Sequence, residues 1–419
     1  MRQWLTPLPM HPCTTERHVM NSATGGLTRR NALTGGLGLI AGALLAACSE
    51  PDATEAGATS EIVLGASLEL TGVGSTLGKL QEQALKVGAE EINSIGVPFG
   101  EGRLYIRVVV KDNGGNPATA AQQAKDLIEQ DKVSALIGGV TVETARTMIA
   151  VAEERKVPLL CLNSGDDMVV PLPQRKFVYQ LGPNASDVAA LMGRELRKLG
   201  LQKVAVLASA DGHGDAGVRA LPRALLTVGR ELVTTVRLPK TGRAFGDVAR
   251  SIVEAEPDAV IVWAQAPLSA AAVAAVRAAG FTGRFILDPG AGADETLSGP
   301  NGKAMEGAYI VHPVVLAGAP TMATTPSGRA ARAFVYRYIQ QYGSFSGFAP
   351  YAADALTLLA TAARRAVSTD PQRLRGRLEG GPIEGIAGAY AFQPISHGGL
   401  EPDALIPFIV RQGAWVRLS

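Results

Sequence analysis

Two threonines beside a glycine pair form the first group of residues that could do chemistry. In the segment GGVTVETA, residues 138–145, Thr141 and Thr144 lie at the expected start of a helix that follows a buried strand. If Thr141 is the N-cap, its hydroxyl, that of Thr144 and the free N–H groups of the first turn converge on one point, a natural receptor for a carboxylate. We therefore treat Thr141, Val142, Glu143 and Thr144 as candidate ligand-binding residues. Plain capping explains the side chain of Thr141 equally well.

The segment NSGDDM, residues 163–168, supplies a second polar loop. It follows the apolar run VPLLCL, which we interpret as a strand. The loop places the side chains of Asn163 and Ser164 and the N–H group of Gly165 at the end of that strand. Neighbouring parallel strands end at the same edge of a sheet, so we expect these groups to lie near Thr141.

Three further polar loops follow expected strands in the second half of the chain, with the sequences ADGHGD, AQAPLS and DPGAGAD. We expect their polar side chains, those of Asp211, His213, Gln265 and Asp288, to face a cleft. A lone histidine more often has a structural role than a functional one, so His213 carries little weight by itself.

The loop TGVGSTLG approaches a nucleotide-binding motif without matching it. Gly72, Gly74 and Gly78 depart from the pattern G-x-G-x-x-G because the last glycine comes one position late. Asp112 could act as the acidic ribose ligand, but it lies about twice as far along the chain as the roughly 20 residues expected. A tight turn at the start of a helix explains the glycines more simply.

Local motifs of catalysis are missing from the sequence. It holds no G-x-S-x-G and no H-E-x-x-H, and the three histidines after residue 48 (His213, His312 and His397) are widely separated. We therefore expect a protein that is not an enzyme and that has no metal site and no resident cofactor.

The elements that position these loops alternate between strands and helices. The clearest unit is residues 104–145, where the strand LYIRVVVKDN, the helix ATAAQQAKDLIEQDK and the strand VSALIGG follow one another. Asn116 is a good N-cap, and Pro117 suits the first helical position. A second series runs from about 185 to 288, with Pro222 expected to kink one helix or shift its start. This alternation predicts an α/β protein with parallel-rich sheets in two consecutive lobes.

The first 47 residues have the features of an export signal. Arg29 and Arg30 precede about 15 apolar and small residues, too short and too rich in glycine for a typical membrane helix, which end in Leu-Ala-Ala before Cys48. This resembles a bacterial twin-arginine signal joined to a lipobox, which implies cleavage before Cys48 and lipidation of its thiol. An uncleaved membrane anchor is the alternative, and Met20 is a possible true start. The small, polar residues 48–60 predict a flexible tether.

Composition and cysteine usage agree with an exported, globular protein. The chain has 419 residues, of which 47% are hydrophobic and 19% are charged, and its net charge is +2. All of the net positive charge lies before Cys48, so the remainder is nearly neutral and lacks the basic surface typical of nucleic-acid binding. Cys161 is the only cysteine after Cys48, and we expect it to be a buried, inert thiol because it follows the apolar VPLL.

The sequence resembles the type I periplasmic binding proteins of the leucine/isoleucine/valine-binding family, the receptors of ABC uptake systems. The resemblance covers nearly all of residues 61–419 and rests on three segments: GASLELTGVGSTLGKLQEQALKVGAEEIN, DNGGNPATAAQQAKDLIEQDKVSALIGG and VPLLCLNSG. It implies two Rossmann-like lobes joined by three crossings, with the ligand between them. One lobe would comprise residues 61–181 and 312–404, and the other residues 182–311 and 405–419.

The resemblance also implies where an amino acid's carboxylate and ammonium would bind, namely at Thr141–Thr144 and Asn163–Gly165. The opposite lobe of the family adds an acidic residue and aromatic walls, and here the chain departs from the pattern. Gly290 stands where the acid is expected, His213 stands at an aromatic wall position, and Leu77 replaces another aromatic. Asp211 or Asp288 could supply the negative charge, and a small organic acid or amide fits about as well as a branched-chain amino acid.

The family mechanism is hinge closure on the solute, after which the closed face docks on a membrane permease. We expect a monomer that is lipid-anchored at a membrane surface and faces the periplasm. Two alternatives stay open from the sequence. One is an exported oxidoreductase with a nucleotide cofactor, because twin-arginine export suits proteins that fold around cofactors. The other is a ligand sensor that partners a signalling receptor.

Overall fold

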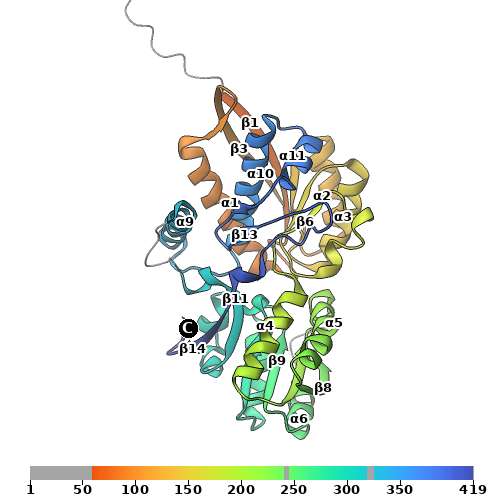
Figure 1. The fold of residues 1–419 in the computed structure, drawn as a ribbon, viewed down its shortest axis with the longest axis vertical. Coiled ribbons are helices and arrows are strands. Elements are labelled where there is room, and N and C mark those ends of the chain that lie inside the picture. Colours follow the sequence, from red (N-terminus) through yellow and green to blue (C-terminus); the bar gives the residue numbers. More distant parts are fainter. Residues whose placement is uncertain (1–58, 240–244, 319–324, 419) are drawn as a thin grey trace, which may run out of the picture. The chain divides into compact units, whose positions relative to one another are not determined.

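A computed structural model of the chain describes residues 59–239, 245–318 and 325–418 (Figure 1). The predicted export signal, with Arg29, Arg30 and Cys48, lies outside the described residues, as does the predicted tether except for its last two residues. Those two residues begin the first strand, β1.

The first lobe is built on a six-stranded sheet of order β2-β3-β1-β4-β5-β6. All neighbouring strands are parallel except β2 and β3, which form an antiparallel pair. The strands are β1 (Thr59–Leu68), β2 (Val97–Phe99), β3 (Gly102–Asp112), β4 (Ala135–Gly138), β5 (Leu159–Cys161) and β6 (Val178–Gln180). The helices of this lobe are α1 (Ser75–Ile95), α2 (Pro117–Glu129), α3 (Val142–Arg155), α9 (Pro326–Tyr342), α10 (Pro350–Ala366) and α11 (Pro371–Leu378).

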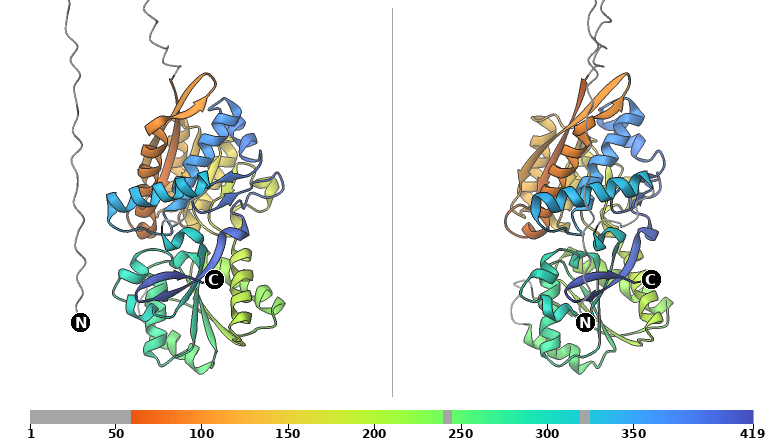
Figure 2. Two further views of the ribbon diagram at one scale, coloured as in Figure 1. Left: turned by 60° about the vertical axis from the view of Figure 1, so that its left-hand side comes forward. Right: turned by 90° about the vertical axis from the view of Figure 1, so that its left-hand side faces the viewer.

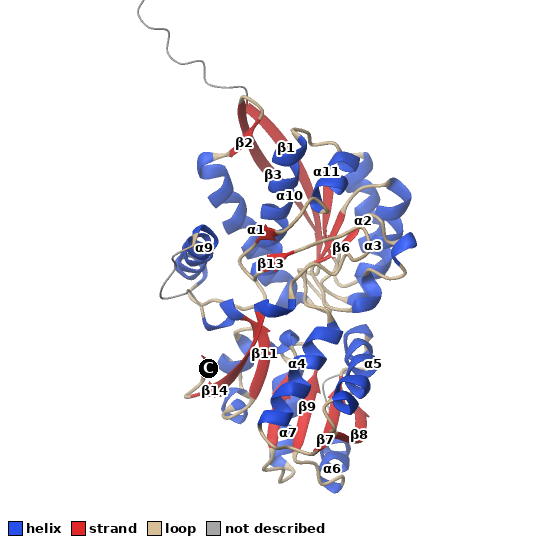
Figure 3. Cartoon of the chain, in the orientation of Figure 1, coloured by secondary structure: helices blue, strands red, loops and turns tan. Residues whose placement is uncertain are grey.

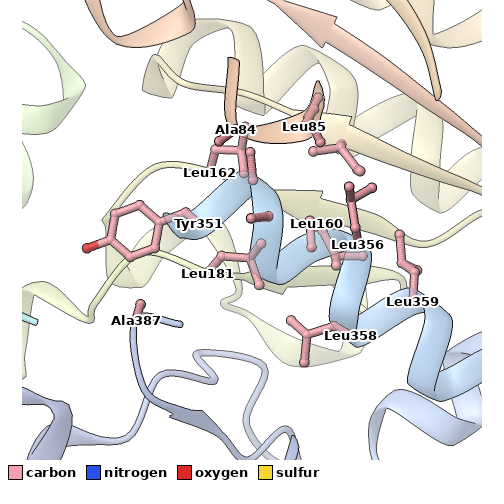
Figure 4. Packing of buried hydrophobic residues seen from close by; sticks show 14 of the residues in the cluster. Ala84, Leu85, Leu160, Leu162, Leu181, Tyr351, Leu356, Leu358, Leu359 and Ala387 are labelled. Carbon is pink, nitrogen blue, oxygen red and sulfur yellow. The ribbon is translucent and has the colours of Figure 1, made fainter. Parts of the chain in front are cut away.

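Helices cover both faces of this sheet, which explains why its strands β4 and β5 are apolar throughout rather than alternating with polar residues. Along β4, Ala135 and Ile137 pack with α1 and α10 on one face, while Leu136 packs with α2 and α3 on the other. Part of the first core is shown in Figure 4, which labels Ala84, Leu85, Leu160, Leu162, Leu181, Tyr351, Leu356, Leu358, Leu359 and Ala387.

The second lobe has a seven-stranded sheet of order β15-β14-β11-β10-β9-β7-β8. Its strands are β7 (Lys203–Ala208), β8 (Glu231–Arg237), β9 (Ala259–Trp263), β10 (Arg284–Leu287), β11 (Tyr309–Pro313), β14 (Leu405–Arg411) and β15 (Ala414–Arg417). The pairs β11·β14 and β14·β15 are antiparallel, and the others are parallel. Helices α4 (Ala185–Lys198) and α5 (Gly212–Thr227) cover one face, and α6 (Gly246–Glu254) and α7 (Leu268–Ala278) cover the other (Figure 3).

The chain crosses between the two sheets three times, as the family resemblance implies. It leaves the first sheet after β6, returns after β11, and joins the second sheet again at β14, the blue strand near the C-terminus in both views of Figure 2. The boundary expected at residues 311 and 312 falls inside β11, which belongs wholly to the second sheet.

Local signals in the sequence predicted several helix ends correctly. Asn116 accepts hydrogen bonds from the N–H groups of Ala118 and Thr119 at the start of α2, with Pro117 as the first helical residue. Pro222 lies inside α5, which begins ten residues before it, so the start of the helix is not shifted to this proline.

Short strands β2, β6 and β11 were not predicted, because segments of three to five residues show little periodicity. The strands β12 (Ile383–Glu384) and β13 (Ala389–Tyr390) form a short separate antiparallel hairpin.

Two further observations concern the thiol of Cys161 and the length of the helices. Cys161 is buried on β5, and burial raises the pKa of its thiol to about 12, so the thiol is inert as expected. Within residues 59–418, apart from the two gaps, we find no helix with the length and apolar character needed to span a membrane.

Candidate ligand-binding site

A cavity of about 380 Å³ lies where loops from both lobes meet. Each wall consists of residues that follow a parallel strand, which is where open α/β sheets bind ligands. The first lobe contributes Val73, Gly74, Gly115, Pro117, Thr141, Val142 and Glu143. The second lobe contributes Ser209, Ala210, Asp211, His213, Gln265 and Leu268.

Thr141 and Thr144, which we call the Thr141 corner of the cavity, already contact a carboxylate that belongs to the chain itself. Glu69, at the end of β1, is fully buried, and its Oε1 accepts hydrogen bonds from the N–H of Thr141 (3.1 Å), the hydroxyl of Thr141 (3.3 Å) and the hydroxyl of Thr144. Burial raises the pKa of the Glu69 carboxyl, and the hydrogen bonds from Thr144 and Thr141 only partly oppose this shift. The two hydroxyls that we expected to converge on a ligand converge on Glu69 instead, together with the N–H of Thr141.

The sequence did not single out Glu69. It lies in the segment EIVLGASLEL, and a glutamate near the end of this apolar run is the only signal that the sequence offers. Its two threonine partners lie 72 and 75 positions further along the chain, so no local pattern connects them.

The second-lobe wall is organised around a buried pair of His213 and Asp288. Nε2 of His213 lies 2.8 Å from Oδ2 of Asp288, whose carboxylate also accepts the N–H groups of Ala264 and Gly290. Burial opposes a charge on His213, but the carboxylates of Asp288, Asp211 and Glu143 together outweigh this effect, and the pKa of His213 is raised. Asp288 therefore lies behind His213 rather than in the cavity wall.

Gly290, the position where the family resemblance implies an acid, has no room for a side chain. A Cβ there would lie 2.9 Å from Nε2 of His213 and 3.0 Å from both Asp288 and Gln265. The acidic residue of this wall is Asp211 instead. Asp211 caps α5 by accepting the N–H of Gly214 (2.9 Å), and it also accepts the hydroxyl of Ser209 (2.6 Å).

The two lobes touch beside the cavity. The N–H of Gly212, the first residue of α5, donates to Oε1 of Glu143 in the other lobe at 3.0 Å. A Cβ on Gly212 would lie only 2.4 Å from Cγ1 of Val142. At the surface, Asp167 pairs with Arg146 of its own lobe (2.8 Å) and with Arg219 of the other lobe (3.2 Å).

The structure therefore brings half of the predicted residues to the cavity wall: Thr141, Val142, Glu143, Asp211, His213 and Gln265. The others, Leu77, Thr144, Asn163, Ser164, Gly165 and Asp288, do not belong to that wall. Leu77 is fully inside the core of the first lobe. Asn163 is buried behind Thr141, whose carbonyl accepts its amide at 3.5 Å, while its Oδ1 has no partner in the described part of the chain. Their ligand-binding role stays a prediction.

The glycine loop and Asp112 have a structural role. Oδ1 of Asp112 accepts the N–H groups of Leu70 (3.0 Å), Thr71 (3.2 Å) and Gly114 (2.9 Å), and Oδ2 accepts the hydroxyl of Thr71 (2.8 Å). These bonds hold the loops after β1 and β3 together at one side of the cavity. Gly72 and Gly74 have positive φ values of 68° and 85°, so glycine is required there by the turn. Across the described residues, no cluster of three His, Cys, Asp or Glu side chains is placed to hold a metal ion.

Comparison with known proteins agrees with this architecture. An amino acid binding protein of Pseudomonas aeruginosa is 24% identical over 336 residues, which are 79% of this chain and 86% of that protein. The fold matches an extracellular ligand-binding receptor from Rhodopseudomonas palustris HaA2, with a TM-score of 0.76, 24% identity and coverage of 86% of this chain and 100% of that one. It also matches the branched-chain amino acid binding protein LivJ of Streptococcus pneumoniae in complex with isoleucine, with a TM-score of 0.72, 20% identity and coverage of 85% and 98%.

At these identities the solved structures establish the fold alone. The family assignment rests on the sequence family described as periplasmic binding protein, which matches residues 61–403. That match spans both lobes and every loop of the cavity, so the chain belongs to the periplasmic binding protein family, with the type I fold.

Proposed function

We propose that this chain is the extracytoplasmic receptor of an ABC uptake transporter and that it binds one small solute, an amino acid or a small organic acid or amide. The observation that carries the proposal is the cavity, because its walls come from loops and helix N-termini of both lobes. The similar proteins support it, since one is called an amino acid binding protein and another holds isoleucine.

Hinge closure follows from a cavity with walls in two lobes. A solute touches both walls only when the lobes meet, so it favours the closed form by its difference in affinity for the two forms. The contacts of Gly212 with Glu143 and Val142 join the lobes and would be lost on opening. The closed face then docks on a permease, and the receptor acts as a monomer.

The predicted export segment supports a receptor that lies outside the cytoplasm, on a lipid anchor in the periplasm. Cys48→Ala should move the protein from the membrane fraction to the soluble fraction, because the acylated thiol is lost. Arg29→Lys combined with Arg30→Lys should block export through the twin-arginine route. Unchanged fractionation of both variants would remove the lipoprotein assignment and the twin-arginine assignment.

A thermal-shift screen of amino acids, amides and organic acids tests the function. A specific solute at 100 times its Kd stabilises the folded chain by about 2.7 kcal/mol. We expect one chemical class to raise the melting temperature, and we expect the permease to be retained by the loaded receptor in a pull-down. If no small molecule changes the melting temperature and none copurifies, the receptor function is wrong.

A further inference from the structure

The donors of the Thr141 corner are already in use. A hydroxyl has one proton to donate. The hydroxyl of Thr144 donates to Glu69, and the hydroxyl of Thr141 contacts only Glu69 (3.3 Å) and Oγ1 of Thr144 (2.9 Å) as possible acceptors in the described residues. The N–H of Thr141 also points at Glu69. A solute carboxylate arriving at this corner would find both hydroxyls and the N–H of Thr141 already engaged.

The charges around the cavity also disfavour a second carboxylate. Glu143 and Asp211 lie in its wall, and the described residues that line it include no lysine and no arginine. His213 is the only basic group of the wall, and it is paired with Asp288. An anionic solute would therefore meet the negative charge of Glu143, Asp211 and Glu69 without a free cation to offset it.

One buried group in the wall still has a free hydrogen-bonding atom. His213 is 5% exposed and its Nε2 is bonded to Asp288, while its Nδ1 has no partner among the residues that the structure describes. A buried ring nitrogen without a partner costs free energy, which a polar solute group could recover. The wall thus offers carboxylate acceptors at Glu143 and Asp211 together with one unsatisfied ring nitrogen at His213.

We infer that Glu69 is a specificity-determining residue that takes the place of a solute carboxylate, so that the cavity selects a solute whose polar end is an amide or amine. The N–H groups of such a solute donate to the acidic wall, and no group of the solute needs the donors that Glu69 uses. This inference rests on the proposed function and narrows it, because it separates amides and amines from the free acids.

Matched acid and amide pairs test the inference with the full chain. The probes are leucine with leucinamide, phenylalanine with phenylalaninamide, and butyrate with butyramide, measured by calorimetry and thermal shift. The wild type should bind the amide of at least one pair at least tenfold more tightly than the acid. Glu69→Ala frees the corner and should shift that preference toward the acid by at least tenfold.

Glu69→Gln keeps the shape and an acceptor oxygen but removes the charge, so it replaces Glu69→Ala in the test if the alanine variant does not fold. It should shift the preference toward the acid by about threefold or more. Glu154→Ala is the control, because this side chain is 60% exposed near the far end of α3, the helix that starts after Thr141, and its removal should leave the preference unchanged.

Equal or tighter binding of the free acids by the wild type would overturn the inference and leave the proposed function standing. A preference that is unchanged in both Glu69 variants would also overturn it. Binding of no acid, amide or amine, with no copurifying solute, would overturn the proposed function and the inference with it.

Discussion

Gly212→Ala should weaken solute binding without unfolding either lobe. Gly212 is the first residue of α5, and it faces Val142 of the other lobe across the contact beside the cavity. A Cβ at this position would lie 2.4 Å from Cγ1 and 2.6 Å from Cβ of Val142, whereas carbon atoms pack best at about 3.5–4.0 Å. The added methyl group therefore opposes the lobe contact directly, while the interior of each lobe is unchanged.

The expected size follows from the cost of inserting a methyl group into a packed contact, which is typically about 1–3 kcal/mol. If the cost falls on the closed form only, the apparent Kd rises by about 5- to 150-fold. Calorimetric titration with the solute found in the screen measures this change. Small-angle scattering of the free protein should report more widely separated lobes than in the wild type.

Gly246→Ala is the matched control for this prediction. Gly246 is also the first residue of a helix in the same lobe, α6, but a Cβ there meets nothing within 4 Å. Val142→Gly should restore most of the affinity lost in Gly212→Ala, because it removes both the Cβ and the Cγ1 of Val142 that the new Cβ strikes. Our reasoning is refuted if Gly212→Ala binds within threefold of Gly246→Ala, or if the double variant recovers nothing.

Three other predictions concern buried histidines and one buried glycine. Burial lowers the pKa of His213, but the carboxylates of Asp288, Asp211 and Glu143 together raise it by a larger amount. The stabilisation that protonated His213 provides is therefore complete below pH 6.5 and is lost as the pH rises through the raised pKa. The fall in unfolding free energy above pH 6.5 should be smaller in His213→Gln. Burial lowers the pKa of His312 to about 4, so His312 does not reduce the unfolding free energy above pH 6.5, where it is neutral. As the pH falls to 4, the unfolding free energy should decrease by roughly 3 kcal/mol. In urea titrations, His312→Asn should show a smaller decrease. Gly217→Ala would place a Cβ 2.3 Å from the indole of Trp263 and should lower the unfolding free energy by about 1–3 kcal/mol, whereas Gly376→Ala, with nothing within 4 Å, should not.

The fold was predictable because its signals are local. Strands and helices alternate with clear apolar patterns, and Asn116 followed by Pro117 marks a helix start within two residues. The helix at Thr141 was predicted for the same reason, and its side chain does accept the N–H of Thr144. A strand such as β6 escaped prediction because only three residues are too few to show a period.

The candidate site was predictable only in part, because its decisive contacts join residues far apart in the chain. Asp112 looked like a ribose ligand, but its partners are the loop residues Leu70 and Thr71, more than 40 positions earlier. Glu69 fills the corner that the threonines form, and nothing near it in the sequence indicates those partners. Sequence patterns located the loops correctly. They could not show that the hydroxyls of Thr141 and Thr144 contact Glu69, because those contacts form only in the folded chain.

The pair of His213 and Asp288 illustrates the same limit. Both residues were predicted to face the cleft. Their hydrogen bond, which holds Asp288 behind His213, could not be predicted because the two residues are 75 positions apart in the chain. The absence of a side chain at Gly290 is explained by packing, since His213, Asp288 and Gln265 fill the volume that a side chain would need. The departures from the family pattern at these positions are thus connected to one another by contact.

Calorimetric titration of a cavity-blocked variant tests the central claim most directly. Ala210 lines the second-lobe wall, and Ala210→Phe adds a ring at the rim of a cavity of about 380 Å³. The solute identified in the screen should bind the wild type at one molecule per chain and should bind Ala210→Phe at least 100-fold more weakly, with both proteins folded. Undiminished binding to a folded Ala210→Phe variant would contradict the claim that the solute occupies this cavity.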